Sequence, residues 1–270
     1  MRELSDFHTV RSTNTELISR VRSLTFVEVG DGVYDILGDV NFSKLGLNSL
    51  LEVIALLKRL VASKVPVRIR TVQGDFSCDY NNLRDLKGAP ERVEGDFKCS
   101  SNQLETLEGA PKYVGRYFAC AANKLTNLVG APQYVGKSFY CLKNQLVSLV
   151  GAPRRIEESF ICYSNNLRTL QGAPEYIGAD FDCSYNRLTY LGGAPKHIEG
   201  DFNCCSNSLR TLAGAPQYVG GDFNCSYNRL VSLEGAPRYV GGSFVCYINL
   251  RKFTKEEVIK LVNVGGEIQT

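Results

Sequence analysis

The feature that most constrains this chain is a sequence unit that returns every 21 residues without an insertion or deletion. Eight Gly-Ala-Pro triplets mark it, and they begin at Gly88, Gly109, Gly130, Gly151, Gly172, Gly193, Gly214 and Gly235. The unit reads G-A-P-x-x-[VI]-x-x-x-F-x-C-x-x-N-x-L-x-x-L-x, with Phe from Phe76 to Phe244 and Asn from Asn81 to Asn249. Such strict spacing predicts a solenoid, in which each unit forms one coil stacked on the coil before it.

The positions of the unit divide into those that face the interior and those that face solvent. Phe and Cys alternate in F-x-C, and this period of two predicts a short strand with both side chains inward. Adjacent coils then pair these strands in one parallel sheet, with strands about 4.8 Å apart. We expect the Asn to turn inward and bond backbone groups of its own and neighbouring coils. The Leu pair and the Val or Ile fill the remaining interior, while Gly and Pro shape the corner.

Nine of the ten cysteines occupy a single slot of the unit: Cys78, Cys99, Cys120, Cys141, Cys162, Cys183, Cys204, Cys225 and Cys246. We interpret this column as small apolar filler, because free Cys is among the most buried residue types. A zinc site is disfavoured because the paired C-x-x-C spacing is absent. Disulfides between neighbouring coils would strain a column of parallel side chains. Cys205 stands outside the series, and alternation places it on the outer face of the sheet as an exposed thiol.

The chain divides into three parts: an N-terminal cap (1–71), a nine-coil array (72–250) and a C-terminal cap helix (251–270). In the first part, Thr25–Leu37 predicts a hairpin that turns at Gly30–Gly32. Residues 38–50 predict a degenerate first coil, with Val40 in the Phe slot and Leu45 in the Asn slot. Residues 1–23 include one helical pattern, and we leave open whether this segment folds only on a partner.

A helix is expected between the first coil and the array, after an N-cap at Asn48 or Ser49. Its apolar stripe consists of Leu50, Val53, Ile54, Leu57, Leu60 and Val61. We interpret this helix as a cap on the first coils, with a docking helix for a partner as the alternative. At the other end, Thr254 and Glu257 predict a capping box. The cap helix there should turn inward Phe253, Val258, Ile259 and Val262.

The F-x-C-x-x-N-x-L stretch resembles the leucine-rich repeat, with Phe and Cys in two of its Leu slots. The short unit is similar to the leucine-rich repeats of secreted bacterial effectors, and Gly221–Pro237 resembles repeat arrays in tailed, T4-like phages. The resemblance implies a mainly β, right-handed leucine-rich-repeat coil with hairpin and helix caps at the N-terminus and a helix cap at the C-terminus. It also implies a phage protein in the host bacterial cytoplasm, where thiols stay reduced.

Several classes of function are disfavoured by what the sequence lacks. The net charge of +3 is too small to argue for nucleic acid. There is no apolar run of membrane-spanning length and no secretory signal near the start. Two histidines lie far apart, and no phosphate loop or nucleophile motif is present. We therefore expect no enzyme, no cofactor and no catalytic or metal site.

The outer face of the sheet, expected to be concave, holds the candidate binding site. Residues before Phe, after Phe and after Cys point away from the core. The apolar part of this site is Tyr117, Ala119, Ala121, Tyr140, Leu142, Ile161 and Tyr163. The acidic and polar part is Asp180, Asp182, Asp201, Asn203, Asp222 and Asn224. Clustered apolar residues on an open sheet mark an interface, although ordinary β-propensity could also place them there.

The acidic part allows three interpretations: a solvated surface, a binding site for a basic segment of a partner, or a Ca²⁺ site. A further row lies two residues after each Pro and should line a lateral edge: Arg92, Tyr113, Tyr134, Arg155, Tyr176, His197, Tyr218 and Tyr239.

Our leading hypothesis is a monomeric, non-enzymatic module that binds a host or phage protein through the concave face and inhibits a host factor. One alternative is a structural protein that self-associates into a homo-oligomer through its ends or the inserted helix. Another is single-stranded nucleic-acid binding along the Tyr and Arg edge.

Overall fold

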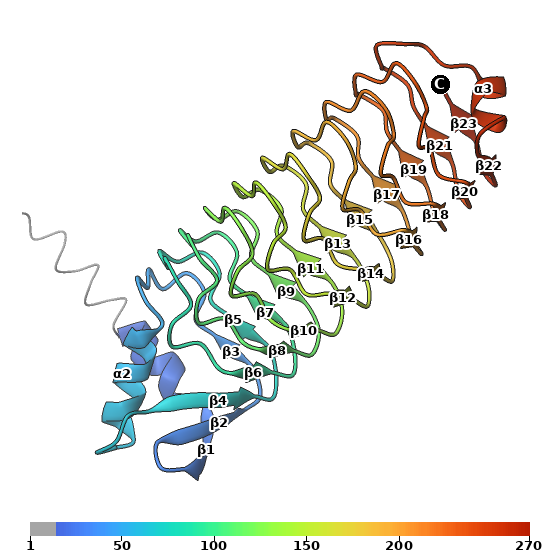
Figure 1. Cartoon of the computed structure of the whole chain (residues 1–270). Coiled ribbons are helices and arrows are strands. Elements are labelled where there is room, and N and C mark those ends of the chain that lie inside the picture. Colours follow the sequence, from blue (N-terminus) through green and yellow to red (C-terminus); the bar gives the residue numbers. More distant parts are fainter. Residues whose placement is uncertain (1–14) are drawn as a thin grey trace, which may run out of the picture.

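Two runs of short parallel strands wind along the solenoid from end to end (Figure 1). The computed structural model describes residues 15–270. Residues 15–22 form a helix, so part of the helix expected within 1–23 is present, and the rest of that prediction lies outside the described residues. The fold is a mainly β, leucine-rich-repeat-type solenoid, as the repeat predicts.

The first run, which we call the Phe sheet, has eleven strands that follow one another in chain order. They are β3 (Val40–Asn41), β5 (Phe76–Ser77), β7 (Phe97–Lys98), β9 (Phe118–Ala119), β11 (Phe139–Tyr140), β13 (Phe160–Ile161), β15 (Phe181–Asp182), β17 (Phe202–Asn203), β19 (Phe223–Asn224), β21 (Phe244–Val245) and β23 (Ile268–Gln269). Equivalent residues pair directly, so that Phe139 lies between Phe118 and Phe160. The Phe and Cys columns are buried, as expected from the alternation.

The second run was not expected, because the repeat predicts only one parallel sheet. It begins with β1 (Thr25–Gly30), β2 (Val33–Leu37) and β4 (Arg68–Val72). It continues with β6 (Arg92–Val93), β8 (Tyr113–Val114), β10 (Tyr134–Val135), β12 (Arg155–Ile156), β14 (Tyr176–Ile177), β16 (His197–Ile198), β18 (Tyr218–Val219), β20 (Tyr239–Val240) and β22 (Asn263–Val264). The residues predicted to line a lateral edge therefore lie in strands. Strands of two residues leave too short an apolar pattern to be recognised in sequence.

This second run is interrupted between β10 and β12, which leaves two six-stranded sheets. Most coils carry Gly two residues after the edge residue, and a Cβ at Gly136 would lie 2.2 Å from the carbonyl oxygen of Gly115. Glu199 carries a Cβ in the equivalent place of a later coil, and there β14 and β16 keep only one pair, Ile177 with Ile198. At Glu157, one coil after Gly136, the Cβ meets the same obstacle and β10 and β12 are not paired. The nearby bond from the Glu158 amide to the Lys137 carbonyl is accordingly long, at 3.4 Å.

The inward Asn side chains join each coil to the coil before it, as predicted. Asn144 donates to the carbonyl of Cys141 in its own coil (3.1 Å) and to that of Cys120 in the previous coil (3.0 Å). Its Oδ1 accepts from the Leu125 amide at 3.1 Å. One amide thus satisfies buried backbone groups in two coils, and Leu45 replaces Asn only in the first coil, where no earlier coil exists.

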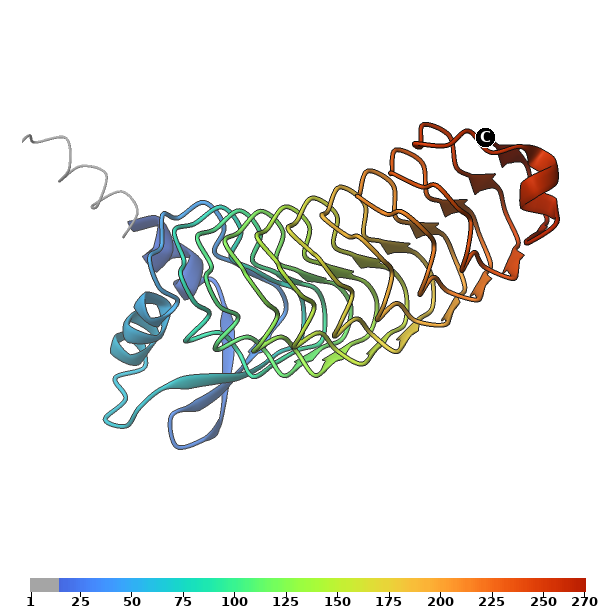
Figure 2. The same cartoon turned by 45° about the horizontal axis from the view of Figure 1, so that its top comes forward.

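The N-terminal end is covered by the hairpin and by two helices (Figure 2). Leu17 and Val21 of the first helix are buried, and Arg20 donates to the carbonyls of Asn41 (2.9 Å) and Ser43 (3.1 Å) beside the first Phe-sheet strand. The inserted helix is α2 (Leu51–Leu60).

Two details of α2 differ from the prediction. Its N-cap residue is Leu50 rather than Asn48 or Ser49. The Glu52 carboxylate accepts from the Asn48 amide (2.9 Å) and the Ser49 amide (3.2 Å), while Ser49 Oγ accepts from the amide of Leu51, the first residue of the helix (3.2 Å). Leu60 is exposed because the helix ends there and leaves the array.

At the other end, the predicted capping box of Thr254 and Glu257 begins α3 (Lys255–Ile259). Phe253, Val258 and Val262 are buried as expected, but the prediction for Ile259 is wrong, since its side chain is 64% exposed. After α3 the chain makes β22 and β23, which extend both runs of strands. The sequence N-V-G-G-E-I (263–268) resembles Y-V-G-G-S-F (239–244) of the previous coil. Because α3 lies between them, the two stretches are not separated by 21 residues, and the strict repeat did not predict the second one.

We predict that the double variant Arg155→Tyr, Glu157→Gly joins the two second-run sheets. It recreates the Tyr-Gly pair of residues 134 and 136 and removes the obstructing Cβ. The free energy of unfolding should rise by about 1–2 kcal/mol, from the restored hydrogen bonds. Urea denaturation measures this change. The reverse swap, Tyr134→Arg with Gly136→Glu, should lower stability, and a destabilised first variant would show that the interruption has another cause.

Candidate functional site

The predicted apolar residues come together on the outer face of the Phe sheet. Tyr140 pairs in register with Ala119 on one side and Ile161 on the other. The rings of Tyr117 and Tyr140 lie 6.1 Å apart. All seven predicted apolar residues are half-buried, because side chains on neighbouring strands shield one another. The resulting apolar patch is Tyr117, Ala119, Ala121, Tyr140, Leu142, Ile161 and Tyr163.

Two cations border this apolar patch and were missed in the sequence analysis. Arg116 and Lys137 lie over the Tyr117 ring, at 5.7 and 5.4 Å from its centroid. Lys137 also pairs with Glu158 at 3.3 Å. Both cations occupy the position two before Phe, and they are the only Lys or Arg residues there, in the coils that begin the patch. That coincidence is a signal in the sequence, and it gives the patch a border of paired cations, since Arg116 also pairs with Asp96 at 3.4 Å.

The predicted acidic residues that precede Phe have a structural task. The amide of Asp201 donates to Asp180 Oδ1 (3.0 Å), and the amide of Asp222 donates to Asp201 Oδ1 (2.7 Å). The Ser243 amide continues the series on Asp222 at 2.6 Å. Each carboxylate therefore accepts from the backbone of the next coil, which explains the row without a cation.

The polar residues that follow Phe form local turns instead. Asp182 Oδ1 accepts from the Ser184 amide at 2.9 Å, and Asn203 and Asn224 accept in the same way from the amides two residues on. Such bonds hold the backbone at the end of each strand. Within residues 15–270, no group of three or more His, Cys, Asp or Glu side chains is placed to hold a metal ion.

The prediction that Cys205 is an exposed thiol is wrong. Its residue is only 8% exposed, in the same position where Ser184 and Ser226 are buried. Burial raises the pKa of the Cys205 thiol, so little thiolate is present near neutral pH. The nine thiols of the column are free and buried as well. Burial raises the pKa of each of them, to about 11 for Cys246 at the end of the column.

Along the Tyr and Arg edge, side chains of neighbouring coils stack on one another. The Arg92 guanidinium lies 3.5 Å from the Tyr113 centroid, and Tyr113 stacks on Tyr134 at 4.7 Å. His197 stacks on Tyr218 at 4.2 Å in the later coils. Arg92 is also paired with a carboxylate, that of Glu94. The structure therefore gives no support to base stacking along this edge, because neighbouring rings and guanidinium groups cover one another's faces.

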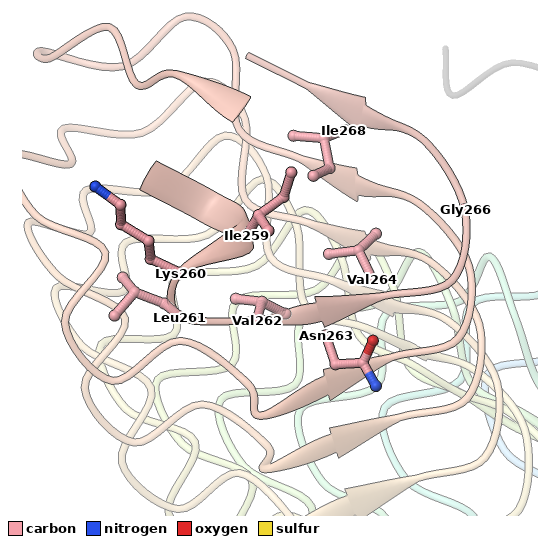
Figure 3. A pocket seen from close by; sticks show the side chains of 8 residues that line it. All are labelled: Ile259, Lys260, Leu261, Val262, Asn263, Val264, Gly266 and Ile268. Carbon is pink, nitrogen blue, oxygen red and sulfur yellow. The ribbon is translucent and has the colours of Figure 1, made fainter. Parts of the chain in front are cut away.

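A second apolar surface lies beyond the last coil. A pocket there is lined by side chains of α3 and of the two strands that follow it, including Ile259, Val264 and Ile268 (Figure 3). Ile259 and Leu261 are 64% and 55% exposed. No strand covers the outer edges of β22 and β23 within the described residues.

The fold and its exposed sheet face define the class: a leucine-rich-repeat-type solenoid built on 21-residue coils. No family model and no curated protein matches the chain. YopM from Yersinia enterocolitica WA-314 is a similar solved structure, with 20% identity and a TM-score of 0.46 over 69% of this chain and 48% of that chain. A second is YopM of Yersinia pestis, a leucine-rich effector protein, with 17% identity and a TM-score of 0.30 over 86% and 88%.

This chain thus spans about half the length of the first of these structures, with 48% of it covered. At such identities the likeness concerns the fold alone. The assignment of the class rests on the repeat and the strand order of this chain.

We predict that the buried thiols make the protein sensitive to base. Their pKa is about 8.5 in an unfolded chain and higher in the folded protein. The unfolded state therefore loses protons first, and the free energy of unfolding falls as pH rises above about 8.5, by up to about 1.4 kcal/mol per pH unit for each thiol. Urea denaturation between pH 7 and 10 measures this slope, and Cys141→Ala should reduce it. A slope unaffected by Cys141→Ala would contradict the assignment.

Proposed function

We propose that the protein is a non-enzymatic binding module that recognises another protein through the apolar patch of the Phe sheet. The observation that supports this is the clustering of apolar side chains in three consecutive coils, where the other coils carry mostly Asp, Asn or Ser, apart from Val245 and Tyr247 in the coil of Phe244. A rigid sheet loses little conformational entropy when it binds, which favours tight association.

The surroundings of the patch favour a partner with a mixed surface. Arg116 and Lys137, each paired with a carboxylate of this chain, lie beside Tyr117 at one side of the patch. Asp201 and Asp222 are exposed on the other side of the patch, toward the C-terminal coils. One carboxylate oxygen of each is bonded to a backbone amide, and the other is available to cations. A partner would therefore place an apolar segment at the centre, with an acidic flank and a basic flank.

The setting proposed from the repeat is a phage-infected bacterium, in which the partner is a host or phage protein and binding blocks a host factor. None of the helices among residues 15–270 has the length and apolar character that a membrane crossing requires.

The test is capture of partners from bacterial lysate by the wild type, Tyr140→Asp and Tyr163→Asp. Each substitution places a charge in the centre of the patch and should weaken capture of a specific partner about thirtyfold or more. Val147→Asp is the matched control, because Val147 is 53% exposed in the coil of Tyr140 but lies on the turn side. Equal recovery of every captured protein by all four proteins would rule out the patch.

The exposed side chains of the last coil favour one second candidate, self-association through the C-terminal end. Ile259 and Leu261 would be buried between two copies. Analytical sedimentation across a wide range of concentrations tests this, with Ile259→Asp as the comparison. A single monomeric species at the highest concentration would argue against it.

A further inference from the structure

A row of unpaired cations runs along the side of the solenoid that carries no strands. This side consists of the turns between each Phe strand and the next Gly-Ala-Pro corner (Figure 1). Six consecutive coils each place one cation in these turns. We call this row the basic ridge: Lys124, Lys143, Arg168, Arg187, Arg210 and Arg229.

The members of the basic ridge lie close together because the turns stack in register. The Arg187 amide donates to the carbonyl of Leu167, the neighbour of Arg168, at 2.9 Å. The Arg229 amide donates to the carbonyl of Leu209, the neighbour of Arg210, also at 2.9 Å. Since adjacent coils are about 4.8 Å apart, the ridge spans about 24 Å. The cations form a band across three slots of the turn: Lys143 stands one residue before the inward Asn, Lys124, Arg187 and Arg229 one residue after it, and Arg168 and Arg210 one residue after the first Leu.

All six side chains are free to bind an anion. All are exposed, and none forms an ion pair within the part of the chain that the structure describes. The turns that carry the first five cations (residues 122–129, 143–150, 164–171, 185–192 and 206–213) contain no Asp or Glu. The carboxylates of these coils lie on the Phe sheet and near the corners instead. A linear polyanion could therefore contact the ridge without meeting like charge.

Exposed aromatic rings accompany the cations of the later coils. Tyr185 is 61% exposed, Tyr190 is 47% exposed and Tyr227 is 49% exposed, all within the turns that carry Arg187 and Arg229. Unlike the rings of the second strand run, Tyr185 and Tyr190 do not stack on any ring among residues 15–270. The Tyr185 ring is therefore available to a planar ligand, whereas the Tyr190 ring lies against Gly192 on one side.

We propose that the basic ridge binds single-stranded nucleic acid, with its cations on successive phosphates and the tyrosines stacking on bases. Cations in a line together with free aromatic faces are the two features by which proteins bind single strands without reading sequence. An acidic polypeptide would use the cations but would have no need of the rings. This site is separate from the apolar patch, which lies on the Phe sheet.

The test is fluorescence anisotropy of a labelled oligothymidine strand at low salt, with polyglutamate as competitor. The variant Arg187→Gln, Arg210→Gln should weaken binding about tenfold or more, and the log–log dependence on salt should become less steep by about 1.4. Lys196→Gln, Arg238→Gln is the matched control, with the same change in net charge outside the ridge, and should bind like the wild type. Tyr185→Ala should weaken oligonucleotide binding about tenfold, through lost stacking.

Three results would overturn the proposal. The wild type could fail to bind the strand at low salt, or the control variant could lose as much affinity as the ridge variant. Polyglutamate could also displace the strand equally well from the wild type and from Tyr185→Ala, which would show that the ridge binds acidic polypeptide. Thermal unfolding of each variant checks that it is folded, and the lysate capture by the Phe sheet is an independent readout.

Discussion

The whole structure depends on the side-chain amide that joins each coil to the one before it. A coil of 21 residues encloses too little apolar volume to be stable alone, so the array is stable only as a stack. The Asn amide secures that stack because it bonds the backbone of two coils at once, at a point where water has no access. A consequence follows for every other position: equivalent residues lie side by side in straight rows, and the surface can be described row by row.

In the second strand run, the residue at the edge and the residue two positions later vary together. In the second strand run, a Tyr is followed two residues later by Gly, whereas Arg92, Arg155 and His197 are followed by Glu. The geometry explains the pairing: a Tyr ring lies over the Gly, as Tyr134 does over Gly136, whereas each Arg or His side chain contacts its Glu. Glu carries a Cβ into a place where the previous carbonyl lies, so this exchange costs backbone pairing at Glu157. Glu94 keeps its bond to the Val72 carbonyl, because it follows the longer strand β4.

The repeat allowed the Phe sheet, the inward columns and the Asn bonds to be predicted, because these depend on residues repeated at a fixed spacing. The hairpin and the cap helices were predicted from their own turn and capping residues, but the strands β22 and β23 after α3 were not. It did not reveal strands of two residues, since a pair of residues has no period. It also predicted the wrong exposure for Cys205: the residue shares the outer-face slot of Ala121, Leu142 and Tyr163 and is not part of the core cluster, but its neighbours leave it only 8% exposed. Ile259 was misplaced because α3 is only five residues long, too short for its apolar pattern to define one face. For the candidate site, the apolar patch assembled as expected, while the carboxylates proved to bond backbone amides, which no sequence pattern discloses.

Positive and negative side chains occupy different positions of the repeat, and the net charge of +3 does not show this separation. A carboxylate before Phe finds a backbone amide from the next coil within reach, so Asp180, Asp201 and Asp222 are partly neutralised by the fold itself. A cation in the turns finds no such partner, because the carbonyls there already accept from the amides of neighbouring coils. The fold therefore uses one oxygen of each carboxylate in this row, whereas the cations of the turns are exposed and form no ion pair among residues 15–270. Charge that the fold does not use is the charge most available to a ligand, and on this solenoid it lies on the turn side rather than on the sheet.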